Sequence, residues 1–127
     1  MEQSVSTKKT YKIDSPDQLA KIITENLCVV IKISACWCGP CKNKHFLEMY
    51  CRLKDNYKKF DSVKFIELDI DDDLDILEDN NYYDISVKSV PTFLIASNGN
   101  FIKKFEGGSD SILESINTIL YDSCTKK

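Results

Sequence analysis

The chain has 127 residues, of which 43% are hydrophobic and 29% are charged, and its formal net charge is −3 at pH 7. This length fits one domain over residues 1–127 with a real hydrophobic core. The slightly acidic balance gives no reason to expect nucleic acid or an anionic membrane as the main partner. Apolar runs fall short of the eighteen or so residues that span a bilayer, and residues 1–12 lack the apolar segment of a secretory signal. We therefore expect a cytoplasmic, monomeric protein kept in a reducing compartment.

The first half of the chain predicts strands and helices in alternation. The alternating segment at 10–13 is typical of an edge strand, and Ser15 followed by Pro16 predicts the start of a helix. The β-branched run CVVIKIS at 28–34 predicts a central strand. From Pro40 to about Phe60 we expect one long helix. Its inner side is predicted to carry Phe46, Leu47, Tyr50, Leu53 and Tyr57.

The second half predicts a strand at 62–70, a short acidic helix at 72–83, a hairpin and a final helix at 109–123. Asn98-Gly99 is typical of a two-residue type I′ turn between hairpin strands. This order predicts an α/β fold with a central mixed sheet of about four to five strands, flanked by about four helices. Residues expected to face inward from the final helix are Ile112, Ile116, Ile119 and Leu120. Loose ends are predicted at 1–8 and 123–127.

The six cysteines, at positions 28, 36, 38, 41, 51 and 124, gather around one motif instead of being spaced as staples. Cys38 and Cys41 form a C-x-x-C pair between a predicted strand and a predicted helix. At a helix start, unpaired N–H groups and the helix dipole favour a thiolate at Cys38, while Cys41 lies one turn in and is more buried. We therefore expect Cys38 to attack a substrate disulfide and Cys41 to resolve the mixed disulfide, with Gly39 and Pro40 fixing the turn.

A metal site is the alternative interpretation of these thiols. Cys36, Cys38 and Cys41 spell C-x-C-x₂-C, a density of soft ligands that could hold Zn²⁺ or Cu⁺. Only His45 offers a fourth ligand, and a histidine one turn into a helix is more often a solvent-exposed residue. We therefore expect no metal, and no cofactor beyond the redox-active Cys38–Cys41 pair.

The acidic stretch DIDDDLD at 69–75 raises the question of a calcium loop. An EF-hand needs Gly at its sixth position and Glu at its twelfth, but Leu74 and Asn80 stand there. We interpret these carboxylates as a solvated helix start, which the helix dipole favours.

The motif WCGPCK at 37–42 resembles the active-site motif of the thioredoxin family, and the element order resembles the thioredoxin fold. Pro91 is similar to the family's cis-proline. The resemblance extends over about residues 10–121, with further matches in VPTF at 90–93, NG at 98–99 and FEGG at 105–108.

The resemblance implies a thiol–disulfide oxidoreductase that acts on protein disulfides. Trp37 would cover the cysteine pair. A substrate groove is implied at Trp37, Val90, Pro91 and Gly107, where the backbone beside Pro91 is free to pair with a bound segment. An external reductase, either thioredoxin-reductase-like or the glutathione system, would recycle the protein.

Two charged residues depart from the family pattern. Lys32 stands where the family has a buried aspartate that helps to deprotonate the resolving cysteine, and Glu67 stands where the lysine partner of that aspartate lies. Because a lone buried charge is costly, we expect Glu67 to pair with Lys32 and keep it charged. Lys32 would then stabilise a thiolate at Cys41, while Glu67 relays the proton through water. The alternative is that Lys32 reaches solvent and matters little.

Other departures concern the active-site helix and the remaining cysteines. Phe46 replaces the proline that commonly kinks this helix, so we expect a straighter one. Cys36 is expected to be dispensable and, like Cys124 in a predicted exposed tail, open to side oxidation. Cys28 and Cys51 are expected to be inert.

Three functions therefore compete. The first is a general reductase of protein disulfides. The second is a more oxidising oxidase or isomerase, because a cation near the cysteines stabilises thiolate and raises the reduction potential. The third, from a different class, is a docking module regulated by its redox pair, without general reductase activity.

Overall fold

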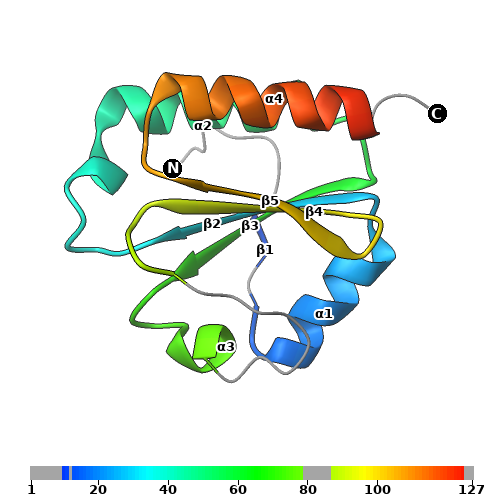
Figure 1. Ribbon diagram of the computed structural model, residues 1–127, viewed down its shortest axis with the longest axis horizontal. Coiled ribbons are helices and arrows are strands. Elements are labelled where there is room, and N and C mark those ends of the chain that lie inside the picture. The colour runs from blue at the N-terminus through cyan, green and yellow to red at the C-terminus, as the bar shows by residue number, and fades with distance from the viewer. Residues whose placement is uncertain (1–9, 12, 79–86, 125–127) are drawn as a thin grey trace, which may run out of the picture.

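The computed structural model describes residues 10–11, 13–78 and 87–124, which form a five-stranded sheet in the order β1-β3-β2-β4-β5 (Figure 1). The pairs β1–β3 and β3–β2 are parallel, whereas β2–β4 and β4–β5 are antiparallel. The predicted mixed sheet is confirmed. Its strands are β1 (Thr10–Tyr11), β2 (Cys28–Ser34), β3 (Val63–Asp69), β4 (Thr92–Ser97) and β5 (Asn100–Glu106).

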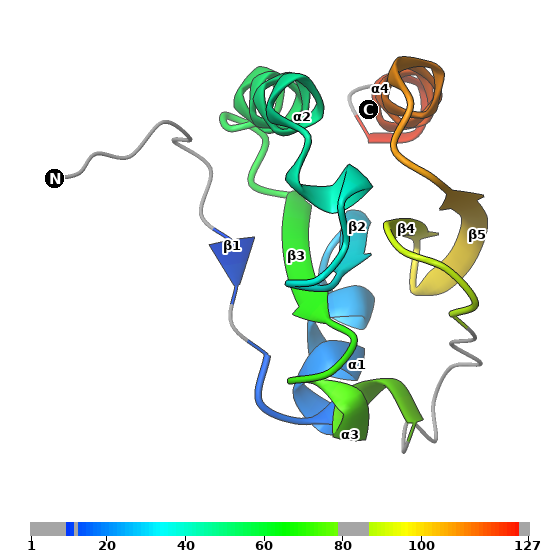
Figure 2. The same ribbon diagram turned by 90° about the vertical axis from the view of Figure 1, so that its left-hand side faces the viewer.

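Helices cover both faces of the sheet, with α2 and α4 on one face and α1 and α3 on the other (Figures 1 and 2). The central strand β2 is apolar at nearly every position, and the residues from Cys28 to Ile33 are all buried. In the described ranges, no helix combines the length and the apolar character needed to cross a bilayer. The helical elements are α1 (Pro16–Glu25), the 3₁₀ turn η1 (Pro40–Lys42), α2 (Lys44–Asn56), α3 (Leu74–Glu78) and α4 (Asp110–Cys124).

The predicted helix start and hairpin turn are confirmed by their local geometry. Ser15 caps α1, because its hydroxyl accepts a hydrogen bond from the Gln18 amide at 3.1 Å. Asn98 and Gly99 have φ values of 54° and 86°. Positive φ at both central residues is what a type I′ turn requires, and it brings β4 and β5 together in register.

The prediction of one long helix from Pro40 is wrong. The chain makes the short turn η1, and α2 begins only at Lys44. Asn43 causes the break, because its side chain accepts a hydrogen bond from the Phe46 amide at 2.9 Å and thereby caps a new helix. Leu47, expected on the inner side, is 37% exposed.

The expectation of a loose segment at 123–127 is also wrong for its first two residues. Ser123 and Cys124 belong to α4, and Cys124 is buried and bonded to Cys28 as a disulfide. Cys124 is therefore not an exposed thiol, and the cysteines do include one long-range pair. The predicted ends 1–8 and 125–127, and the part of the acidic helix after Glu78, lie outside the described residues.

Candidate active site

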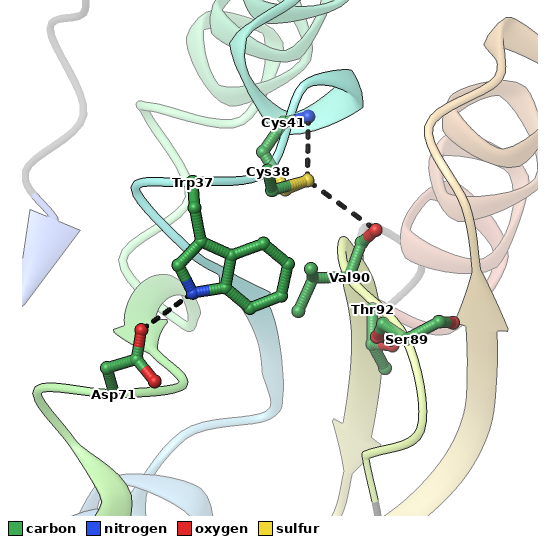
Figure 3. Close-up of a disulfide and its surroundings, with 7 residues drawn as sticks. All are labelled: Trp37, Cys38, Cys41, Asp71, Ser89, Val90 and Thr92. Carbon is green, nitrogen blue, oxygen red and sulfur yellow. Dashed lines mark hydrogen bonds between the residues drawn. A yellow bond between two sulfur atoms is a disulfide. The ribbon is translucent and has the colours of Figure 1, made fainter.

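The cysteine pair lies where the chain leaves the central strand. After β2 ends, a turn closed by a hydrogen bond from the Cys38 amide to the Ala35 carbonyl (3.1 Å) leads into η1, which contains Cys41. Cys38 and Cys41 are bonded as a disulfide, with their Cα atoms 5.2 Å apart (Figure 3). Because β2 has neighbours on both sides in the sheet, this turn has a rigid base.

The backbone around Cys38 favours a thiolate on its sulfur. The Cys41 amide N–H donates to Cys38 Sγ at 3.0 Å, and a donor aimed at a sulfur stabilises negative charge on it. Cys38 Sγ also lies 3.6 Å from the Val90 carbonyl oxygen, which can accept the S–H of the reduced thiol (Figure 3). The two contacts thus serve the two protonation states of the same sulfur.

The expected contrast in burial between the two cysteines is wrong as a statement about exposed area. Cys38 is 3% exposed and Cys41 is 5% exposed. The difference between them lies in what they face. Cys38 lines a cleft of about 380 Å³ whose described lining does not include Cys41. A substrate in this cleft therefore meets Cys38 first.

A cleft contains two of the four residues predicted for the substrate groove, and the other two play another part. Trp37 and Val90 line the cleft beside Cys38, and the Val90–Pro91 bond is cis, as the resemblance implied. Pro91 is buried, and its carbonyl accepts a hydrogen bond at 2.8 Å from the Gly107 amide. Gly107, which has a positive φ of 113°, thus holds the cis-proline loop in place through its backbone amide. The cleft is also lined by Gly39, which the sequence analysis placed in the active-site turn, and by Ile70, Lys88 and Ser89, which sequence reasoning missed.

Trp37 stands at the rim of the cleft and is held by a residue that the sequence did not single out. Its side chain is 64% exposed, and its indole N–H donates to Asp71 Oδ2 at 2.8 Å (Figure 3). The interpretation of the acidic stretch as a merely solvated helix start is therefore wrong for Asp71. The carboxylate of Asp69 accepts from the amides of Asp71 and Asp72 at 2.8 and 2.9 Å, and so builds the turn that presents Asp71.

We expect Asp71→Ala to release Trp37 and weaken substrate binding. A net hydrogen bond is worth about 0.5–1.5 kcal/mol, so KM for a protein disulfide should rise by up to about tenfold with little change in kcat. Since Trp37 is the only tryptophan in the chain, its fluorescence emission should shift in the same variant. Asp72→Ala removes an equal charge from the same turn and serves as the control. Equal behaviour of the two variants would contradict a specific role for Asp71.

Lys32 and Glu67 are neighbours and attract each other, as expected, but their charged groups form no direct ion pair among the described contacts. The two residues are paired in register on β2 and β3, and Lys32 is 4% exposed, so it does not reach solvent. The ammonium of Lys32 lies over the rings of Tyr50 and Phe46, 5.2 and 6.0 Å from their centroids. Glu67 is bound instead by Lys54 of α2, whose Nζ lies 3.5 Å from its carboxylate.

Lys54 was missed because its place in α2 looks like that of an ordinary surface lysine. Its Nζ lies 5.3 Å from the centroid of the Tyr50 ring, so that ring has two ammonium groups close to it. Burial lowers the pKa of Lys32, and the charge of Lys54 lowers it further, while Glu67 opposes the shift. Burial also raises the pKa of Tyr50 well above its ordinary value, with Glu67 adding to the effect. We call Lys32, Tyr50, Lys54 and Glu67 the buried charge cluster.

The residues considered as metal ligands have other partners or surroundings in the structure. His45 Nε2 lies 3.0 Å from Asp110 Oδ2 of α4, Cys36 is exposed, and Cys38 is bonded to Cys41. Among the described residues, no three metal-ligating side chains of His, Cys, Asp or Glu gather at one point. What the described geometry offers is a reactive sulfur in a cleft, beside a cis-proline.

Comparison with known proteins decides the family. The thioredoxin family model matches residues 10–118. The chain belongs to the thioredoxin family. Thioredoxin from Gallus gallus is 39% identical over 87 residues, covering 68% of this chain and 72% of that protein. Thioredoxin 1 from Plasmodium falciparum is 30% identical over 104 residues, covering 82% and 90%.

The fold agrees with this assignment. The crystal structure of oxidised mitochondrial thioredoxin 3 from Saccharomyces cerevisiae superposes with a TM-score of 0.69 at 28% identity, over 86% of this chain and 93% of that one. The chain is therefore a thiol–disulfide oxidoreductase of the thioredoxin family, acting on protein disulfides through a redox-active disulfide. This is the activity that the resemblance implied.

Proposed function

We propose that the protein works as a general reductase of protein disulfides, with Cys38 as the nucleophile and Cys41 as the resolving cysteine. The observation that carries the assignment is the asymmetric placement of the pair. Cys38 Sγ faces the cleft between Trp37 and Val90 and receives the Cys41 amide N–H, whereas Cys41 lies behind it in η1.

The reaction follows from this placement. The Cys38 thiolate attacks one sulfur of the substrate disulfide, a mixed disulfide forms, and the other substrate sulfur leaves as a thiolate. The Cys41 thiolate then attacks Cys38 Sγ and releases the second substrate thiol. The substrate gains two electrons, and the Cys38–Cys41 disulfide is left oxidised.

The substrate segment is proposed to dock beside the cis-proline loop. Val90 and Ser89 line the cleft, and the Thr92 hydroxyl donates to the Ser89 carbonyl at 2.6 Å, which fixes the loop that presents them. An extended segment laid here would pass within reach of Cys38 and use backbone hydrogen bonds for affinity. Recognition through backbone hydrogen bonds depends little on the side chains of the substrate, so it suits many protein substrates.

An external reductase is proposed to return the electrons, either thioredoxin-reductase-like or through glutathione. One similar solved structure, 27% identical in sequence, concerns thiol resolution in a yeast mitochondrial 1-Cys peroxiredoxin via the glutathione and thioredoxin systems, which is why both systems enter the assay below. We propose a cytoplasmic location, which suits the exposed free thiol of Cys36. Because one relative is mitochondrial, fractionation of the source cells is the direct test.

Reduction of insulin is the assay that tests the proposal. The full chain, with NADPH and either thioredoxin reductase or glutathione plus glutathione reductase, should precipitate insulin at a rate far above that of the reductase system alone. The measured reduction potential should lie near the value of about −270 mV typical of thioredoxin. A value near −120 mV would favour the oxidase alternative instead, and an inert chain would favour the docking module.

A further inference from the structure

A second pair of cysteines lies at the end of β2 opposite the catalytic pair. Cys28 is the first residue of β2 and Cys124 is the last residue of α4, and their sulfurs are bonded although the two residues lie 96 positions apart in sequence. Their Cα atoms are 6.2 Å apart, within the usual range for a disulfide. The length of β2 alone places this pair about 20 Å from the catalytic turn. Direct exchange with Cys38 or Cys41 is therefore excluded by distance.

This pair is sealed from large thiols. Cys28 is 0% exposed and Cys124 is 1% exposed, and both belong to the core cluster between the sheet and the helices α2 and α4. Cys28 Sγ has the Ser97 hydroxyl as a neighbour at 3.9 Å. Because Cys124 ends its helix, fraying of the last turn of α4 is the smallest motion that opens the pair. Small oxidants can follow such an opening, while glutathione and protein thiols are held back by their size.

We propose that Cys28 and Cys124 form a second redox site, a buried dithiol that hydrogen peroxide converts into a disulfide fastening α4 to β2. When the last turn opens, the Cys124 thiolate attacks one peroxide oxygen, giving a sulfenic acid and releasing hydroxide, which takes up the thiol proton to form water. The turn closes again, and the Cys28 sulfur displaces the second water from the sulfenic sulfur. Two thiols and one peroxide thus give one disulfide and two water molecules.

The bond joins the first residue of the central strand to the last residue of the final helix. The closed loop contains β2, the catalytic pair and every described element from β2 to α4, while β1 and α1 lie outside it. Closing so long a loop restricts the unfolded chain strongly and stabilises the folded state. During oxidative stress the fold is thereby strengthened, while Cys38 and Cys41 go on exchanging with substrates at the other end of the strand.

The test uses the full chain carrying Cys36→Ser, Cys38→Ser and Cys41→Ser, which leaves Cys28, Cys51 and Cys124. Dilute hydrogen peroxide should remove the mass of two hydrogen atoms, and peptide mapping should find Cys28 linked to Cys124. Cys51 serves as the internal control and should still accept an alkylating agent. The thermal midpoint of the peroxide-treated protein should exceed that of the dithiothreitol-reduced protein by about 10 °C or more.

Cys28→Ala and Cys124→Ala in the same background are the matched variants. Either change can lower stability by leaving a cavity, so the quantity compared is the difference between treated and reduced samples of one variant. The difference in thermal midpoint between treated and reduced samples should vanish in both Cys28→Ala and Cys124→Ala. If the peroxide dose is increased until Cys51 is oxidised and Cys28 still reacts with the alkylating agent, the proposal is overturned. A linked pair that leaves the midpoint unchanged would overturn its claimed role in fastening α4.

Discussion

Cys38→Ser should abolish the reduction of protein disulfides, with turnover falling on the order of a thousandfold or more. The cleft presents Cys38 Sγ to the substrate, and Cys41 is not among the described lining residues. A serine hydroxyl at that place cannot attack a disulfide at neutral pH, because its pKa lies far above that of a thiol. Insulin reduction with an excess of reductase measures the loss.

Cys41→Ser should behave differently, because the first step of the reaction remains possible. Cys38 still attacks, and without the resolving thiol the mixed disulfide persists, so a fluorescent disulfide-containing peptide should stay attached until dithiothreitol is added. Cys51→Ser, which removes a partly buried thiol from α2, is the control and should leave both steps intact. Capture of the peptide by Cys38→Ser in place of Cys41→Ser would reverse the assigned roles.

The sequence predicted best what depends on local patterns. The apolar run of β2 and the Asn98-Gly99 turn each carry a strong short-range signal, and the mixed character of the sheet followed from the order of the predicted elements. The cysteine motif correctly indicated that Cys38 lies just before a helical turn. Each of these conclusions needed only residues close together in the chain.

Contacts between residues far apart in the chain could not be predicted from the sequence. Nothing local marks Asp71 as the acceptor for Trp37 across 34 positions, or Cys124 as the partner of Cys28 across 96. Lys54 has the helical context of a surface lysine, and only the packing of α2 on β3 brings it to Glu67. The break at Asn43 was missed for another reason. Its capping side chain competes with a continuous helix, and the sequence alone does not say which arrangement prevails.

Glu67→Gln should be the most damaging single change in the buried charge cluster. It leaves the ammonium groups of Lys32 and Lys54, both close to the Tyr50 ring, without the carboxylate that attracts both. Removing one partner of a buried ion pair costs several kcal/mol, and since Glu67 is 37% exposed we expect about 1–2 kcal/mol here. Guanidinium unfolding measures the loss.

A double-mutant cycle separates the two lysines. If Lys54 is the direct partner, Lys54→Met should recover much of the stability lost in Glu67→Gln, whereas Lys32→Met should recover less. Lys64→Met, on the same strand as Glu67, is the matched control for removal of a lysine. Equal recovery by all three lysine variants would show that only net charge matters, and would contradict the pairing.

The lowered pKa of Lys32 predicts how the stability of the fold changes with pH. Its pKa in the folded protein lies below its value in the unfolded chain, so between those two values the unfolded chain binds the extra proton. Stability should therefore rise as pH increases through the folded-state pKa of Lys32, until it levels off near the unfolded value of about 10.4. Tyr50 acts in the opposite direction above about pH 10, where the unfolded chain loses its proton first. The rise should disappear in Lys32→Met, and the later fall should remain.

The catalytic role proposed for Lys32 can be tested in the same variants. In a Cys38→Ser background the ultraviolet absorbance of thiolate reports the pKa of Cys41 once the other thiols are accounted for. If the Lys32 ammonium stabilises a thiolate at Cys41, then Lys32→Met should raise that pKa in this background. In the chain that keeps both Cys38 and Cys41, the same change should slow release of the mixed disulfide. Exchanging the charges, as Lys32→Asp with Glu67→Lys, should fail to restore activity, because the new lysine would face Lys54. Adding Lys54→Met to the exchange should restore it. If the pKa of Cys41 is unchanged in Lys32→Met, Lys32 has no role in the reaction. It then contributes only to the stability of the core.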